Sequence, residues 1–192
     1  MEKIAVFLTE YVEKKGMITK DEYSIYVYGF QVTLEIILCI FISSIIAGLF
    51  DMLIEEILFF VIFIPLRSYA GGLHLKNYWS CLLLSCLTFS VVLFMCKTSY
   101  IESSISFVAL IVLILSVWVM YPVENGNRSV DKEENDYFRK RLKKYLLIDV
   151  LIALICLVIN NEQYLLLCTI TFFMVAVTML IGKFKSTVYS KK

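Results

Sequence analysis

The sequence predicts an all-α integral membrane protein with six transmembrane helices, an amphipathic N-terminal helix at the membrane surface and both termini in the cytoplasm. Of its 192 residues, 60% are hydrophobic and 18% are charged, and the mean hydropathy is +0.81. Six apolar runs follow one another, at residues 28–50, 52–66, 78–96, 101–121, 145–159 and 164–182. About 20 helical residues cross a hydrocarbon core of ~30 Å, so the short second and fifth runs are tilted, enclosed by the bundle or re-entrant.

The N-terminal segment before the first run, residues 1–25, predicts two surface helices. Charged residues separate apolar ones that recur at helical spacing, namely Ile4, Phe7, Leu8, Tyr11 and Val12. Gly16 ends this helix, and Thr19 with Glu22 forms a capping box for a second helix that continues into the first run. We do not expect a cleavable signal peptide, because the first long apolar run begins only after residue 25 and no small-residue cleavage site follows it.

Basic residues decide the orientation, because loops rich in lysine and arginine stay in the cytoplasm. Every lysine and arginine except Lys97 lies in the N-terminal tail, in the loops at 67–77 and 122–144, or in the C-terminal tail. Six crossings with cytoplasmic termini account for this distribution, whereas two re-entrant hairpins would leave the basic loop at 122–144 outside. The sequence therefore predicts a single polytopic membrane domain over residues 1–192, with both of these loops cytoplasmic.

The loop at 67–77 and the residues after it carry the candidate chemistry. His74, the sole histidine, follows the Gly71–Gly72 pair and precedes Cys81 by seven residues. An imidazole can take the proton of a thiol or stabilise the thiolate, so the two form a candidate nucleophilic pair. The alternative is an interfacial histidine beside a buried, inert cysteine.

The spacing of this pair requires a break in the helix. Residues seven apart on one helix are separated by ~10.5 Å along its axis, whereas proton transfer needs about 3 Å. Gly71 and Gly72 can adopt positive φ, and Asn77 can cap a helix that carries Cys81 in its first turns. Free N–H groups there favour a thiolate and an oxyanion. Cys86 is a rival nucleophile, but it lies more than one turn deeper in the membrane.

Further charged residues have two interpretations each. Arg67 either binds a substrate carboxylate or the oxyanion, or anchors the span at the interface. The basic cluster is either a positive-inside anchor or a dock for an acidic substrate segment, and comprises Arg139, Lys140, Arg141, Lys143 and Lys144. Glu35 and Asp149 face the bundle or the interface and are candidates for contact with the site. Asp51, Glu55 and Glu56 are expected to be solvated at the other membrane face.

Several classes of site are not expected. The net charge of +1 gives no global basic surface for nucleic acid. The six cysteines show neither C-x-x-C spacing nor a cluster of histidine or acidic partners, so neither a metal site nor a disulfide framework is predicted, and no cofactor is implied.

Two further motifs stand beside the candidate site: Y-G-F-Q-V at 28–32 and P-V-E-N at 122–125. With these motifs, and with Arg67, Gly72, His74 and Cys81 at the family spacing, the chain resembles the accessory gene regulator B (AgrB) family of membrane peptidases from Gram-positive quorum-sensing systems. The resemblance implies that Cys81 is the nucleophile and His74 the general base and acid of a cysteine endopeptidase in the cell membrane. Its substrate would be an AgrD-like autoinducer propeptide, cleaved near its C-terminus and cyclised through an acyl thioester, and the enzyme would be a homodimer.

Two other functions compete with this one. A small membrane transporter or channel would use Glu35 and Asp149 as coupling groups, and a non-catalytic membrane scaffold would tolerate replacement of Cys81. If the peptidase interpretation holds, Asn77 and Ser85 are candidates for orienting His74, and a bare dyad is the alternative.

Overall fold

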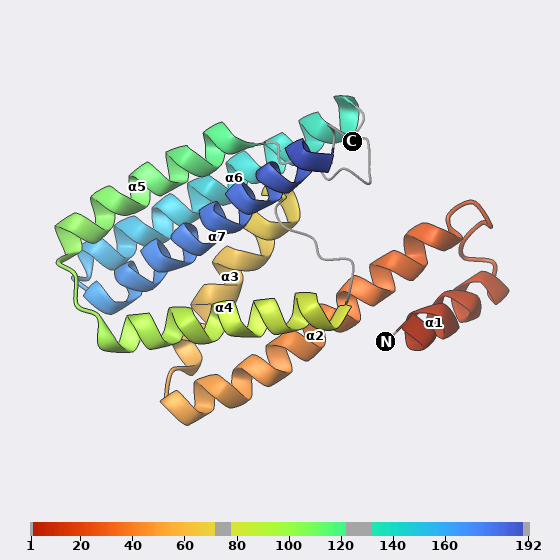
Figure 1. Ribbon diagram of the computed structural model, residues 1–192, viewed down its shortest axis with the longest axis horizontal. Helices are drawn as coiled ribbons and strands as arrows, with labels where there is room; N and C mark the ends of the chain where they lie inside the picture. Colours follow the sequence, from red (N-terminus) through yellow and green to blue (C-terminus); the bar gives the residue numbers. More distant parts are fainter. Residues whose placement is uncertain (1, 72–77, 122–131, 190–192) are drawn as a thin grey trace.

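The computed structural model describes residues 2–71, 78–121 and 132–189, and all its regular elements there are helices. They are α1 (Glu2–Lys14), α2 (Tyr23–Phe50), α3 (Leu53–Ala70), α4 (Tyr78–Thr98), α5 (Ser103–Met120), α6 (Lys132–Val158) and α7 (Glu162–Tyr189). Helices α2 to α7 run in alternating directions between the two ends of a bundle (Figure 1). The all-helical prediction is confirmed.

The two ends of the bundle differ in charge. The acidic end comprises the connections at 51–52, 99–102 and 159–161 with the helix termini beside them, and its charged groups are Asp51, Glu55, Glu56, Glu102, Glu162 and Lys97. Lys97 Nζ donates to Phe50 O at 3.1 Å, and Gln163 Nε2 donates to Glu55 Oε1 at 3.0 Å, so neighbouring helices are tied together there. At the opposite, basic end, α3 and α5 end and α4 and α6 begin.

The two short apolar runs are parts of continuous helices. All but the first residue of the second run lies in α3, an 18-residue helix. All but the last residue of the fifth run forms the later part of the 27-residue α6, whose first part is charged. Each helix joins opposite ends of the bundle, unlike a re-entrant hairpin (Figure 1). Among the described residues, three helices are long and apolar enough to cross a membrane: α2, α5 and residues 162–184 of α7. The number six stays a prediction.

Helix α7 is the central helix of the bundle. Of its most apolar window, 67% is buried, against 17% for α2 and 28% for α5. One side of α7 packs into a core shared with α3, α5 and α6, which includes Phe172. Another side, including Leu166 and Ile170, joins a core built from α2, α3 and α4. Both hydrophobic cores therefore depend on this one helix.

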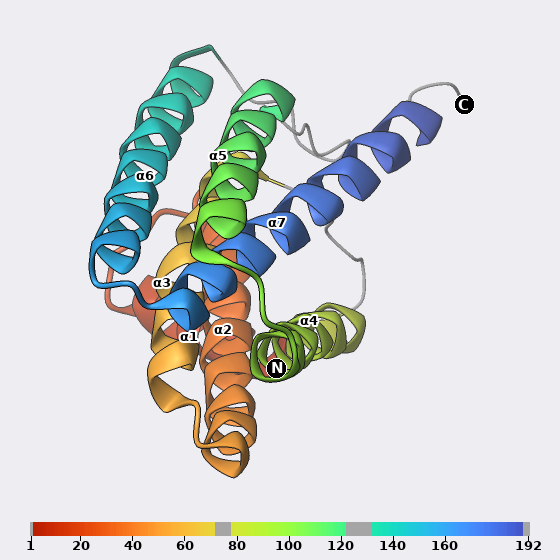
Figure 2. The same cartoon turned by 90° about the vertical axis from the view of Figure 1, so that its left-hand side faces the viewer.

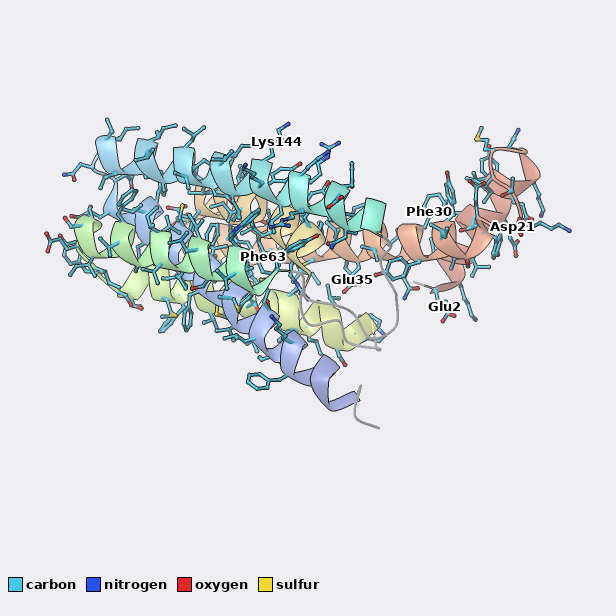
Figure 3. All side chains as sticks on the ribbon, turned by 90° about the horizontal axis from the view of Figure 1, so that it is seen from above. Glu2, Asp21, Phe30, Glu35, Phe63 and Lys144 are labelled. Carbon is cyan, nitrogen blue, oxygen red and sulfur yellow. The ribbon has the colours of Figure 1, made fainter. Side chains whose placement is uncertain are left out.

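The N-terminal hairpin projects beyond the bundle, as the positions of Glu2, Asp21 and Phe30 show (Figure 3). Helix α1 packs on α2 through Ala5 and Thr9, both fully buried, while Phe7 is 66% exposed. Its predicted position at a membrane surface stays a prediction.

The turn between these two helices follows the sequence closely. Gly16, at φ +70°, ends α1 as predicted, with Gly16 N–H bonded to Glu13 O and Met17 N–H bonded to Val12 O. Thr19 N–H donates to Glu22 Oε2 at 2.9 Å, which is one half of the predicted capping box. This backbone hydrogen bond, followed by the one from the Thr19 hydroxyl, lowers the pKa of Glu22. The helix itself begins only at Tyr23, with Glu22 rather than Thr19 as its N-cap. Helix α2 then continues without interruption into the first apolar run, as expected.

Candidate active site

The last turn of α3 carries the first predicted site residues. Arg67 is half-buried there, and its Nη1 donates to Gly71 O at 3.3 Å. Gly71 follows the helix with φ +80°, which confirms the positive φ predicted for it. A guanidinium at a helix C-terminus is favoured by the partial negative charge of the terminal carbonyls. Arg67 therefore stabilises the point where the chain leaves α3.

Cys81 lies in the first turn of α4, which begins at Tyr78, as the sequence predicted. The first backbone N–H groups of a helix have no intrahelical acceptor, so they can bind negative charge. His74, Gly72 and Asn77 lie outside the described residues, and the side chain of Cys81 is likewise not described. The proximity of the imidazole and the thiol thus stays a prediction.

Aromatic side chains hold the start of α6 against the end of α3. The rings of Tyr69 and Tyr145 stack with centroids 5.4 Å apart and an interplanar angle of 15°, and the ring of Phe138 lies 6.1 Å from that of Tyr69. Tyr69 is two residues from Arg67 and from Gly71. The stack therefore brings the basic part of α6 to the end of the bundle where α4 begins (Figure 1).

The five residues of the predicted basic cluster, all on α6, fall into two groups. Arg139 lies over the ring of Trp118 at 5.3 Å, and Arg141 lies over the ring of Tyr137 at 5.1 Å. These arginines have aromatic partners. The other group consists of the exposed side chains of Lys140, Lys143 and Lys144. Figure 3 shows Lys144 on the outer side of α6. The arginines fit the anchoring interpretation, and the lysines are accessible to an anionic partner.

Asp149 and Glu35, the two carboxyl groups that the sequence analysis placed within the spans, have different surroundings. Asp149 is 4% exposed, and its Oδ2 has no hydrogen-bond partner among the described residues. Leu146 and Ala153, one turn before and after it on α6, belong to the core shared with α3, α5 and α7. Sequence analysis did not anticipate that Asp149 Oδ2 would lack a hydrogen-bond partner in the part of the chain that the structure describes. Such a carboxyl is costly to bury in the charged form.

Glu35 lies closer to the depth of Cys81. Two contacts between α2 and α4, that of Phe50 with Lys97 and that of Cys39 with Cys86, join residues with the same difference in number. The same offset sets Glu35, which is half-buried, level with Leu82. The structure thus places Glu35 near the depth of the first turn of α4, whereas Asp149 interacts with Cys168 of α7.

Sequence reasoning missed the aromatic residues of this end, Tyr69, Trp118 and Tyr145. A signal was present, since aromatic residues gather at membrane interfaces and each of these lies near the end of an apolar run. The sequence could not show that Tyr69 of α3 stacks on Tyr145 of α6, or that Trp118 of α5 lies under Arg139 of α6. These contacts depend on which faces of the helices meet.

Comparison with known proteins gives one family and several relatives. A family model described as Accessory gene regulator B matches residues 2–181. A putative AgrB-like protein of Clostridium perfringens strain SM101 is 24% identical over 166 residues, which cover 79% of this chain and 76% of the relative. Protein FsrB of Enterococcus faecalis is 29% identical over 119 residues, 62% of this chain and 48% of FsrB. No solved structure matches the chain.

Proposed function

The chain belongs to the accessory gene regulator B family, and on this premise we propose that it is a membrane cysteine endopeptidase that cleaves and cyclises an autoinducer propeptide. The membership and the likeness to FsrB support a role in quorum-sensing autoinducer processing, with an AgrD-like propeptide as partner. The apolar helices and the relatives point to a membrane protein of Gram-positive bacteria.

The observation that carries the proposal is the location of Cys81 in the first turn of α4, the helix that follows Arg67 and Gly71 along the chain. Here His74 takes the thiol proton, and the sulfur attacks a peptide carbonyl near the propeptide C-terminus. The oxyanion is stabilised by the N–H groups of the first turn. The C–N bond then breaks, and the imidazolium gives its proton to the leaving amine.

Cyclisation completes the reaction. A cysteine or serine of the propeptide attacks the acyl thioester on Cys81, the new thioester or ester bond closes the ring, and Cys81 leaves as a thiol. Exchange between two thioesters is nearly balanced in free energy, whereas hydrolysis runs downhill. The site must therefore exclude water and hold the internal nucleophile close, which suits a thiol at the edge of a membrane bundle.

The topology belongs to the same proposal. Helices α2 to α7 are six spans of one domain, the basic end faces the cytoplasm with both termini, and α1 lies at the membrane surface. The catalytic loop at 67–77 and the basic loop at 122–144 are then cytoplasmic. Two copies of the chain form the active homodimer.

Trapping the acyl-enzyme tests the central step. Incubation of the purified protein with a propeptide whose internal nucleophile is replaced by alanine is expected to add the mass of the N-terminal fragment to the peptide containing Cys81. Hydroxylamine should remove this mass, because it cleaves thioesters. The measurement is mass spectrometry after proteolysis, with Cys81→Ala as the blank. An adduct that appears equally in the blank would contradict the proposal.

The exposed lysines of α6 are proposed to bind the acidic tail of the propeptide. Replacing Lys140, Lys143 and Lys144 together by glutamine is expected to raise KM about five- to thirtyfold with little change in kcat, since each exposed charge pair contributes roughly 0.3–0.7 kcal/mol. The effect should shrink at high salt.

The matched control removes the same charge elsewhere. Replacing Lys3 and Lys14 of α1 together with Lys15, the residue after it, by glutamine leaves α6 intact and should leave KM within about twofold. An equal rise of KM in both triple variants would show that net charge, rather than the α6 lysines, governs substrate binding.

A further inference from the structure

A groove runs along the outer side of the bundle between α2 and α3. It encloses about 410 Å³. Its apolar walls include Ile57, which is 64% exposed, and Val61, which is 50% exposed, so the groove opens to the surroundings of the bundle rather than to its core. Figure 2 shows the two helices side by side near the acidic end. The site proposed above lies at the other end.

The groove ends in a carboxyl group. Glu56 lines the groove at the acidic end, and its side chain is only 5% exposed. Among the described residues, its hydrogen-bond partner is Ser44, whose Oγ donates to Glu56 Oε1 at 2.8 Å. A carboxylate has about four lone-pair positions, so most of its hydrogen-bonding capacity is unused. The sequence had suggested a solvated Glu56, and the structure corrects this because Ser44 and the groove walls cover it.

The length of the groove matches one leaflet of a bilayer. From Glu56 to Pro65 the lining residues of α3 span nine helical steps, or ~13.5 Å at 1.5 Å per residue. Half of a hydrocarbon core of ~30 Å is ~15 Å. A single acyl chain can therefore lie along the apolar walls while its headgroup remains at the level of Glu56.

The charges at the acidic end determine which lipid headgroup fits beside Glu56. The acidic end carries several carboxyl groups and one basic side chain, Lys97, which is bonded to Phe50 O. This surface disfavours an anionic lipid. A primary ammonium group brings three N–H donors to Glu56, whereas the quaternary ammonium of phosphatidylcholine brings none.

From these observations we propose that the α2–α3 groove binds one phospholipid with a primary-amine headgroup, its acyl chain along α3 and its ammonium group on Glu56. The chemical class is that of phosphatidylethanolamine. The groove reaches Pro65 near Arg67, but its carboxyl group, Glu56, lies eleven residues before Arg67 on α3, or ~16.5 Å along the helix. The lipid site and the proposed peptidase site therefore use different chemical groups, and each can fail without the other.

Native mass spectrometry tests the proposal with the wild-type chain released from vesicles of equimolar phosphatidylethanolamine, phosphatidylcholine and phosphatidylglycerol. We expect one retained lipid per chain, with phosphatidylethanolamine favoured roughly five- to tenfold over phosphatidylcholine, as for one charge-assisted hydrogen-bonded contact. Equal retention of the three lipids overturns the proposal. So does a groove filled by a second copy, detected as disulfide cross-linking between chains carrying Val61→Cys.

Two variants test whether Glu56 causes the preference for phosphatidylethanolamine over phosphatidylcholine. Glu56→Gln keeps the size of the side chain and removes its charge, and should reduce the preference to within about twofold of unity. Glu102→Gln removes an exposed carboxyl of the same end and should keep the full preference. If Glu56→Gln keeps the full preference for phosphatidylethanolamine, the proposal that Glu56 binds the ammonium group is wrong, even if peptidase activity is normal.

Discussion

A His74→Ala variant is expected to process the propeptide about 1,000-fold more slowly than the wild type, and Cys81→Ala is expected to release no cyclised product. General acid–base catalysis contributes typically 10²–10⁴-fold, and in this mechanism the imidazole acts twice, on the thiol and on the leaving amine. Loss of the sulfur removes the covalent route altogether. The measurement is the rate of product formation in vesicles containing propeptide and each variant, quantified by mass spectrometry.

Cys86→Ala provides the matched control. Cys86 lies on the same helix, five residues further into the membrane, and is half-buried. Its replacement removes one thiol without touching the first turn of α4, so processing should stay within about threefold of the wild type, as for a small change in packing. If Cys81→Ala still processed the propeptide, or if Cys86→Ala alone abolished processing, Cys81 would not be the nucleophile.

Phe172→Ala is expected to destabilise the bundle by about 3–5 kcal/mol, the cost of removing a fully buried phenylalanine side chain. Phe172 is 0% exposed and lies in the core that α7 shares with α3, α5 and α6. The cavity left by the ring would be bordered by four helices that cannot all collapse into it. Reversible unfolding in mixed micelles, followed by circular dichroism, gives the free energy of unfolding.

The neighbouring residue supplies the control for this prediction. Phe173 is 51% exposed on the other side of α7, so Phe173→Ala removes the same atoms from a position outside the core. Its effect should remain below about 1 kcal/mol. Equal losses of stability in the two variants would argue against α7 as the central helix.

The sequence by itself determined which regions form the apolar helices and where two of the breaks between helices lie. Apolar runs of membrane-spanning length predicted the regions that became α2, α4, α5 and α7, and single residues predicted breaks, as Gly16 and Gly71 show by their positive φ. The residues at the family spacing also predicted the family, which the match over residues 2–181 confirms. These features depend on local chain geometry or on residue identity, so no knowledge of neighbouring helices was needed.

The tertiary structure alone decided which helices meet. Sequence patterns showed neither the central position of α7, nor the stacking of Tyr69 on Tyr145, nor the covering of Glu56 by Ser44. In a water-soluble helix, the polar face reveals which side is exposed. In a membrane the lipid-facing and core-facing sides are both apolar, so hydropathy does not distinguish them, and close packing selects the contacts between helices.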